Sequence, residues 1–261
     1  MTGRWVDGCR LAVGTLTAVP IRPPGQIDRQ VAGVAMLLAP VATLPLALVP
    51  LLAHLAVARI GMPPALAAAL TVGVVAWLSR GLHLDGLADT ADGFAASFDR
   101  QRALDVMRMG NVGPAGVSTV VLVALIQVTA LAALVPTWRG AVLAMVAVVG
   151  SRHTLAWLCA PWFPSARPKG LGATVAGSVR GGAQVGVLIA LTVAYAAAAV
   201  LVWPGAWRFG LAAFAVLGAG LAGALVVGLQ ARRRLGGITG DILGAGVEIG
   251  LAAGLVVAAC L

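Results

Sequence analysis

Three aspartates with helical spacing are the residues of this chain best suited to chemistry. Asp85, Asp89 and Asp92 lie in the run GLHLDGLADTADG, residues 81–93. On an α-helix they would share a stripe about 60° wide. Like charges this close repel one another, so a cation should lie opposite them. Carboxylates without a nearby cysteine favour Mg²⁺ or Mn²⁺ over zinc, and Mg²⁺ commonly adds water and substrate phosphates to one or two carboxylates. The three aspartates therefore predict a Mg²⁺ site for phosphate chemistry.

The alternative for this stripe is a surface helix whose acids only face water. A solvating face usually mixes lysine with glutamate, whereas this one carries only aspartate between glycines. His83 belongs to the same run, and three roles are open for it: metal ligand, general base or structural hydrogen-bonding residue.

A second acidic pair lies in GGITGDILGAGVE, residues 236–248. Asp241 and Glu248 are seven residues apart and would share one face of a helix. Glu248 falls inside an apolar run, and an acid within a membrane segment is a functional candidate by default. Its alternative role is to pair with a buried base such as Arg152. The catalytic candidates are therefore His83, Asp241 and Glu248.

Four basic residues are candidates for phosphate binding. The arginine fork matches phosphate oxygens, and the loop FPSARPKGLG, residues 163–172, carries two cations on a backbone stiffened by proline. A charge within an apolar run must face a partner or a polar cavity. The alternative for the loop cations is anchoring on the cytoplasmic side. The four candidates are Arg108, Arg152, Arg167 and Lys169.

The elements that position these residues are predicted to be transmembrane helices. The chain of 261 residues is 60% hydrophobic and 10% charged, with a mean hydropathy of +0.98, so it has too little charge to cover a soluble domain. About 20 apolar residues cross a hydrocarbon core as a helix. The sequence predicts an all-α, polytopic membrane protein with one domain, 1–261. Seven spans are expected, with six or eight possible: 31–58, 64–79, 114–135, 141–163, 183–203, 209–229 and 242–261.

The first two predicted spans are irregular. Span 31–58 contains Pro40, Pro45 and Pro50, and span 64–79 is short. Proline removes a backbone donor and kinks a helix. We therefore expect one or both of these spans to be kinked or partly re-entrant.

The basic residues orient the chain. With the N-terminus inside, seven spans place fourteen of the 18 Lys and Arg residues on the cytoplasmic side, as the positive-inside rule requires. Arg59, Arg139 and Arg208 fall outside, and Arg152 lies within a span. Eight of the nine acids also fall in cytoplasmic segments. This predicts a multi-pass protein of the cell (inner) membrane with its active site on the cytoplasmic side.

The net charge of +9 is explained by this topology together with anionic lipid. Because the basic residues are spread over four cytoplasmic segments, we expect membrane lipid as a partner and no nucleic acid. The scattered Cys9, Cys159 and Cys260 are expected to be free thiols. The N-terminal region lacks the pattern of a cleaved signal peptide. A homo-oligomer remains open.

The run GLHLDGLADTADG resembles the signature of the cobalamin synthase family, the adenosylcobinamide-GDP ribazoletransferases. Three further motifs follow the family in order: LTAVPIRP from Leu16, FPSARPKGLG from Phe163 and GGITGDILGA from Gly236. The resemblance covers essentially the whole chain. It departs at MGNVGP, residues 109–114, where family members commonly carry an acid before the Gly-Pro-x-Gly turn. From this loop we therefore retain only Arg108 as a site candidate.

The resemblance implies a Mg²⁺-dependent membrane transferase. It would join adenosylcobinamide-GDP to α-ribazole or its 5′-phosphate, release GMP and give adenosylcobalamin or its phosphate. The three aspartates would hold one or two Mg²⁺ ions on the pyrophosphate, and His83 or Asp241 would take the proton of the attacking hydroxyl. Three alternatives are weaker: a cation-coupled transporter, a phosphotransferase of the CDP-alcohol type and a non-enzymatic scaffold.

Overall fold

The computed structural model describes residues 2–202 and 207–261, and it contains helices and no strand within those ranges. The predicted all-α class is therefore confirmed. The helices are α1 (Thr2–Leu16), α2 (Arg29–Ala42), α3 (Leu44–Ala47), α4 (Val49–Ile60), α5 (Pro64–Leu78), α6 (Leu82–Ala96), α7 (Arg100–Val106), α8 (Pro114–Leu134), α9 (Trp138–Leu158), α10 (Leu171–Val175), α11 (Ala183–Val202), α12 (Trp207–Leu235) and α13 (Gly240–Ala259).

Several of these helices are long and apolar enough to cross a membrane, which confirms a polytopic membrane protein. Five described segments qualify alone: 29–60, formed by α2 to α4, and helices α8, α9, α12 and α13. A sixth forms if α5 and α6 make one broken span. The shorter apolar helix Ala183–Ala197, within α11, falls in the remaining predicted span, 183–203, whose last residue lies outside the described residues. Each of the seven predicted spans thus falls on an apolar helical segment.

The predicted kinks in the first span are confirmed. The helix breaks after α2 and again after α3, so that Pro45 and Pro50 occupy the first turns of α3 and α4, where a missing N–H is tolerated. At the first break the hydroxyl of Thr43 donates to the carbonyl of Ala39 at 2.8 Å. The same carbonyl also accepts from the backbone amide of Thr43 at 3.2 Å, so Thr43 closes the end of α2 with both its amide and its hydroxyl.

The short second span ends in a sharp turn between α5 and α6, which meet at 91°. Arg80 has φ +58° and Gly81 φ +66°, so two successive residues take the left-handed conformation. The Arg80 guanidinium donates to the carbonyl of Gly14, and the amide of Ala18 donates to the carbonyl of Leu78 at 2.6 Å. The end of α1 thus holds the turn that directs α6 away from the axis of α5.

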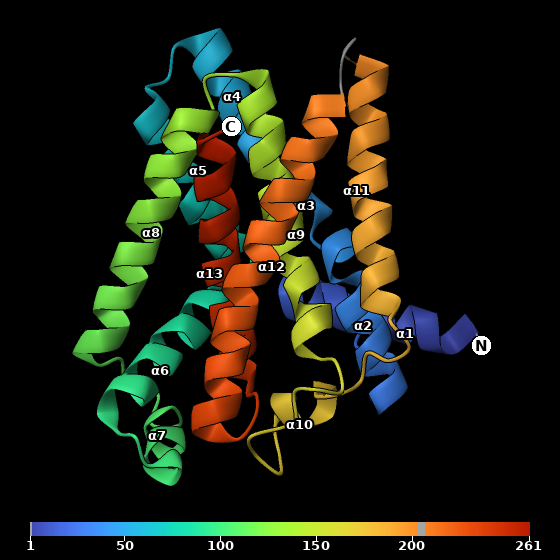
Figure 1. The fold of residues 1–261 in the computed structure, drawn as a ribbon, viewed down its shortest axis with the longest axis vertical. Helices are drawn as coiled ribbons and strands as arrows, with labels where there is room; N and C mark the ends of the chain where they lie inside the picture. The colour runs from blue at the N-terminus through green and yellow to red at the C-terminus, as the bar shows by residue number, and fades with distance from the viewer. Residues whose placement is uncertain (1, 203–206) are drawn as a thin grey trace.

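Helix α13 is central in the bundle, where it packs against α6, α8, α9 and α12 (Figure 1). The short helices α7 and α10, with the lower part of α6, lie at the end opposite the C-terminus (Figure 1). The start of α13 and the end of α12 reach the same end. Segments predicted to be cytoplasmic therefore gather at one end of the bundle. Cys9, Cys159 and Cys260 are free, as predicted.

Candidate active site

At this end of the bundle, the loop after α9 and the loop before α13 are joined by backbone hydrogen bonds, although they are distant in sequence. Ser165 and Ile238 form an isolated parallel bridge. The amide of Ala166 donates to the carbonyl of Ile238 at 2.9 Å, and the amide of Ile238 donates to the carbonyl of Pro164 at 2.8 Å. A side chain at Gly237 would collide with the Pro164 carbonyl. The motifs FPSARPKGLG and GGITGDILGA therefore meet through their backbones.

Helix α7 is hydrogen-bonded to the loop after α9 and to the end of α12, where the loop before α13 begins. Arg100 donates through Nε to the carbonyl of Leu235 and through Nη2 to the carbonyl of Ala166, each at 2.7 Å. Arg167 donates in return to the carbonyl of Leu104 at 2.8 Å. Arg100 thus satisfies the last carbonyl of α12 and joins it to the loop. Sequence reasoning placed Arg100 on the cytoplasmic side but missed this role, because its spacing to Ala166 and Leu235 carries no periodic pattern.

The acidic stripe predicted on residues 85–92 lies on α6 and faces outward at its first two positions. Asp85 is exposed and Asp89 is partly exposed. Within the described residues neither carboxylate accepts a hydrogen bond or pairs with a base. Both can therefore bind a cation or substrate without breaking an internal contact.

Asp241 joins these two acids because α6 and α13 approach closely. A side chain at Gly86 would stand 2.7 Å from the carbonyl oxygen of Asp241, so glycine is required at this contact. Thr239 caps α13 by accepting from the amide of Ile242 at 3.3 Å, and its hydroxyl donates to Oδ2 of Asp241 at 3.1 Å. The third acid of the face is thus held in a defined orientation.

Arg167 supplies positive charge next to these acids. Its Nη1 lies 3.5 Å from Oδ2 of Asp241, and both side chains are half-buried. Burial lowers the pKa of Arg167 from its ordinary value, and the neighbouring Asp241 raises it again. The Nε group of Arg167 has no hydrogen-bond partner in the described part of the chain. The exposed Arg108 is close enough to lower the pKa of Arg167, and Lys169 is also exposed. We call Asp85, Asp89, Asp241 and Arg167, with Arg108 and Lys169, the charged face.

Asp92, the third aspartate of the predicted metal site, has a different environment from the two acids before it. Its Oδ2 accepts from the amide of Gly113 at 2.6 Å and its Oδ1 from the amide of Gly116 at 2.8 Å. These are free donors at the start of α8, where a negative charge is favourable. Asp92 is 9% exposed. In the described part of the chain, no three His, Cys, Asp or Glu side chains lie close enough to hold a metal.

A two-carboxylate Mg²⁺ site nevertheless fits the charged face. Asp85 and Asp89 stand one helical turn apart, offer hard oxygen atoms and have no internal partner to displace. Mg²⁺ characteristically uses one or two carboxylates and completes its shell with water and phosphate oxygens. The Gly-Pro-x-Gly turn was the sequence feature that could have marked Asp92 as different, because its amides need an acceptor.

The other three candidates lie apart from the charged face, within the bundle. Arg152, one of the predicted phosphate-binding residues, is 0% exposed. Glu248 is 5% exposed and lies two turns into α13. His83 is 3% exposed and points about 160° around α6 from Asp85. The structure brings His83, Arg152 and Glu248 to the core and not to the predicted site, because helix periodicity turns them inward.

Comparison with known proteins agrees with the resemblance seen in the motifs. The family model described as cobalamin-5-phosphate synthase matches residues 8–259. A protein of Nocardioides sp. named adenosylcobinamide-GDP ribazoletransferase is 44% identical over 252 residues, 95% of this chain and 96% of its own. Proteins of that name from Frankia casuarinae and Pseudomonas fluorescens (strain SBW25) are 40% and 36% identical, covering 96% and 92% of this chain and 93% of each relative.

No solved structure matches the chain. The match to the family model extends over nearly all of the sequence, and the relatives are covered over more than nine tenths of their own lengths. These matches favour the transferase reading over a transporter. The chain belongs to the cobalamin-5-phosphate synthase family.

Proposed function

We propose that this protein joins adenosylcobinamide-GDP to α-ribazole, or to its 5′-phosphate, and releases GMP. The product would be adenosylcobalamin or its 5′-phosphate. The names of its relatives support this activity. The structural observation that carries the proposal is the charged face, where the carboxylates of Asp85 and Asp89, unpartnered within the described residues, lie with Asp241 and Arg167 at one end of the bundle. Such a face suits a substrate with a pyrophosphate group.

Asp85 and Asp89 would hold Mg²⁺. When bound there, Mg²⁺ would neutralise charge on the pyrophosphate oxygens and on the departing GMP. Asp92 is left out of this set because its two oxygens already accept backbone N–H groups.

The remaining residues of the charged face would bind the phosphates and move the proton. Arg167, Arg108 and Lys169 would orient the phosphate oxygens. Asp241 would take the proton of the ribazole 5′-hydroxyl, since Oδ1 of Asp241 accepts no hydrogen bond from the described residues while Oδ2 is held by Thr239 and Arg167. The hydroxyl oxygen bonds to the phosphorus attached to cobinamide, and the bond from that phosphorus to the bridging oxygen breaks to release GMP.

Residues 1–261 would act as a single membrane-embedded catalytic domain. The charged face takes residues from α6, the loop after α9 and the start of α13, so it needs both halves of the chain. The loops that carry it contain most of the basic residues, which supports placing it on the cytoplasmic side.

The activity is tested by GMP release from detergent-purified protein given adenosylcobinamide-GDP and α-ribazole, with Mg²⁺ or with EDTA. We expect GMP and a joined corrinoid product with Mg²⁺, and neither with EDTA. The 5′-phosphate is compared in a parallel reaction. A folded protein that forms no joined product with Mg²⁺ or Mn²⁺ would overturn the proposal.

The orientation is tested in a background in which Cys9 and Cys260 are replaced by serine. A single cysteine is introduced at Arg102, near the charged face, or at Arg59, at the opposite end. A membrane-impermeant thiol reagent applied to intact cells should label the Arg59→Cys protein and spare the Arg102→Cys protein. The reverse pattern would place the charged face outside.

A further inference from the structure

A group of buried polar side chains occupies the core of the bundle, apart from the charged face. Glu248 of α13, Gln127 of α8, Arg152 of α9 and His83 of α6 are between 0% and 5% exposed. The carboxylate of Glu248 accepts from Nε2 of Gln127 at 2.8 Å. The charges of Arg152 and Glu248 also act on each other. The charge of Arg152 acts on the ring of His83 as well, so four helices contribute to one polar cluster in the core of the bundle.

This cluster leaves many hydrogen-bonding groups without partners. Arg152 uses Nη1 to reach Ser151 at 2.8 Å, but its Nε and Nη2 find no acceptor among the residues that the structure describes. The same holds for both ring nitrogens of His83 within 2–202 and 207–261. Among the described residues, Glu248 and Arg152 form no ion pair within 4.0 Å. Buried polar groups left in this state are costly, so their partners should be sought nearby.

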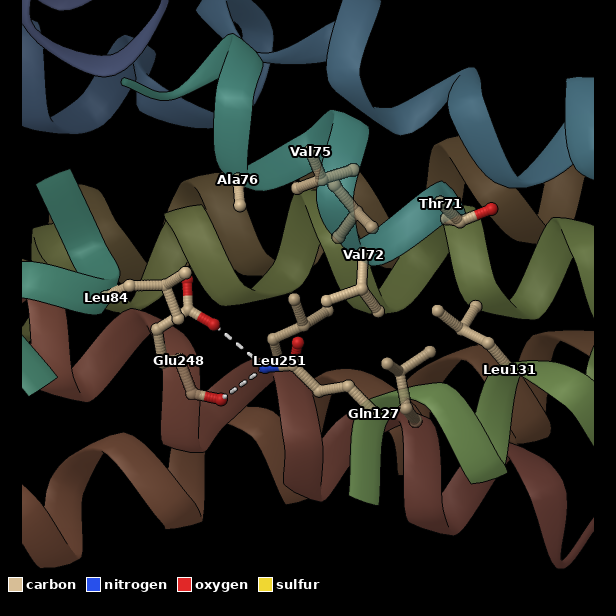
Figure 2. Close-up of a pocket in the computed structure, with 11 residues that line it drawn as sticks. Thr71, Val72, Val75, Ala76, Leu84, Gln127, Leu131, Glu248 and Leu251 are labelled. Atoms are coloured by element: carbon tan, nitrogen blue, oxygen red, sulfur yellow. Dashed lines mark hydrogen bonds between the residues drawn. The ribbon is translucent and has the colours of Figure 1, made fainter. Parts of the chain in front are cut away.

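A pocket adjoins the cluster and offers the necessary space. Gln127 and Glu248 line it together with apolar side chains that include Ala76 and Leu84 (Figure 2). Val148 also lines it and lies one turn before Arg152 on the same side of α9. Nη1 of Arg152 lies 3.5 Å from the carbonyl oxygen of Val148. The guanidinium of Arg152, which does not itself line the pocket, thus lies beside one of its lining residues.

The charges of Glu248 and Arg152 indicate which kind of molecule the pocket can bind. One carboxylate and one guanidinium cancel, so an added cation would be repelled by Arg152 and an added anion by Glu248. The occupant must also donate to Glu248 and accept from Arg152. A small neutral molecule that does both is water, which commonly fills polar cavities in proteins and bridges groups too far apart to bond directly.

We propose that the pocket beside Glu248 is a water-binding site, and that its water bridges Glu248 and Arg152 into one neutral network joining α8, α9 and α13. Leu84 of α6 lines the same pocket, so the network packs against the helix that carries Asp85 and Asp89. The inference does not depend on the substrate of the charged face.

Filling the pocket provides the first test, because the sign of the effect separates a hydrated site from an empty one. Ala76→Val adds two methyl groups that point into the pocket (Figure 2). Filling an empty apolar cavity stabilises a protein, whereas displacing bridging water leaves its partners unsatisfied. We expect the midpoint of thermal unfolding in detergent to fall by about 3–6 °C. Ala69→Val, on the exposed side of α5, is the matched control and should leave it unchanged.

A steric clash of the added methyl groups with their neighbours could also lower the midpoint, and a variant that lacks the two buried charges separates this cause from the loss of water. In the double variant Glu248→Leu, Arg152→Met, there is no charged network to hydrate, so adding Ala76→Val should leave the midpoint unchanged or raise it. Equal falls in both backgrounds, or a rise in the otherwise unchanged protein, would overturn the proposal.

A double-mutant cycle tests whether Glu248 and Arg152 act as one unit. Each single variant, Glu248→Gln or Arg152→Gln, leaves one buried charge uncompensated and should lower the midpoint by roughly 10 °C. The combined variant removes both charges, so we expect its loss to be less than half the sum of the single losses. Losses that add would show that the two charges do not interact, and the network would be wrong.

Discussion

The charged face and the buried polar cluster are built on the same two helices, yet they differ in how their ionisable groups are satisfied. Helix α6 turns Asp85 and Asp89 outward and His83 inward, and α13 carries Asp241 at its exposed start and Glu248 two turns deeper. At the face, carboxylate oxygens remain free. In the core, Glu248 is bonded to Gln127 and lies near Arg152. Free oxygens suit binding of a ligand, whereas compensated charges suit cohesion between helices.

This contrast teaches that an ionisable residue in a membrane helix is not by its type a catalytic one. A substitution at the charged face should remove activity and spare stability. A substitution in the core, or at an acid already bonded to the backbone, should do the opposite. The aspartates of α6 are well suited to test this. Asp89 and Asp92 are three residues apart, but Asp89 accepts no hydrogen bond from the described residues, whereas Asp92 accepts two from backbone amides.

The largest effect is expected for Asp89→Asn. The amide keeps the size of the side chain but removes a charge that has no internal partner. We expect GMP release to fall by about 1,000-fold, equivalent to about 4 kcal/mol of transition-state stabilisation. The midpoint of thermal unfolding, measured on the same preparation, should change little. Near-normal turnover would remove Asp89 from the site.

Asp92→Asn should give the opposite pattern. One oxygen would become an NH₂ group facing a backbone donor of Gly113 or Gly116. We expect a loss of about 3 kcal/mol in the free energy of unfolding, because a buried donor at the start of α8 loses its charged acceptor. Turnover per folded molecule should stay within a few-fold of the unchanged protein. If Asp92→Asn matched Asp89→Asn in activity while keeping its stability, Asp92 would be a ligand after all.

Gly116→Ala tests the contact between Asp92 and the start of α8 by changing the α8 residue. The added methyl group would collide with Oδ2 of Asp92 and stand 2.9 Å from the carbonyl oxygen of Ala88. We expect a loss of about 2 kcal/mol in the free energy of unfolding, measured by thermal unfolding in detergent. Gly73→Ala is the control, because nothing lies within 4 Å of that position. A neutral result at Gly116 would show that α6 and α8 can separate without cost.

Lys169→Gln should have the smallest effect. Lys169 is exposed, and we infer that it contributes to phosphate binding by charge alone. We expect the KM for adenosylcobinamide-GDP to rise about threefold, equivalent to about 0.7 kcal/mol, with kcat unchanged. The rise should shrink at high ionic strength, since salt screens exposed charges. A large fall in kcat would instead give Lys169 a role in the transition state.

Much of the fold could be predicted from the chain because membrane helices are formed by local sequence. Runs of about 20 apolar residues and the basic residues between them indicate the spans and their orientation. Pro40, Pro45 and Pro50 indicated the breaks in the first span, because the missing donor acts at its own position. The acid cluster of α6 was visible for the same reason, since residues three and four apart share a helix face.

The sequence by itself determined the helical class, the family and the concentration of charge at one end of the bundle. Only the tertiary structure decided which charges remain free. Asp89 and Asp92 share one helix face in the sequence, and only the structure shows that Asp92 accepts from two amides at the start of α8, more than twenty residues away. The pairing of the loops around Ser165 and Ile238 depends on contacts between distant segments. Hydrogen-bond partners across helices leave no local periodicity, and they determine whether a charge is structural or available for chemistry.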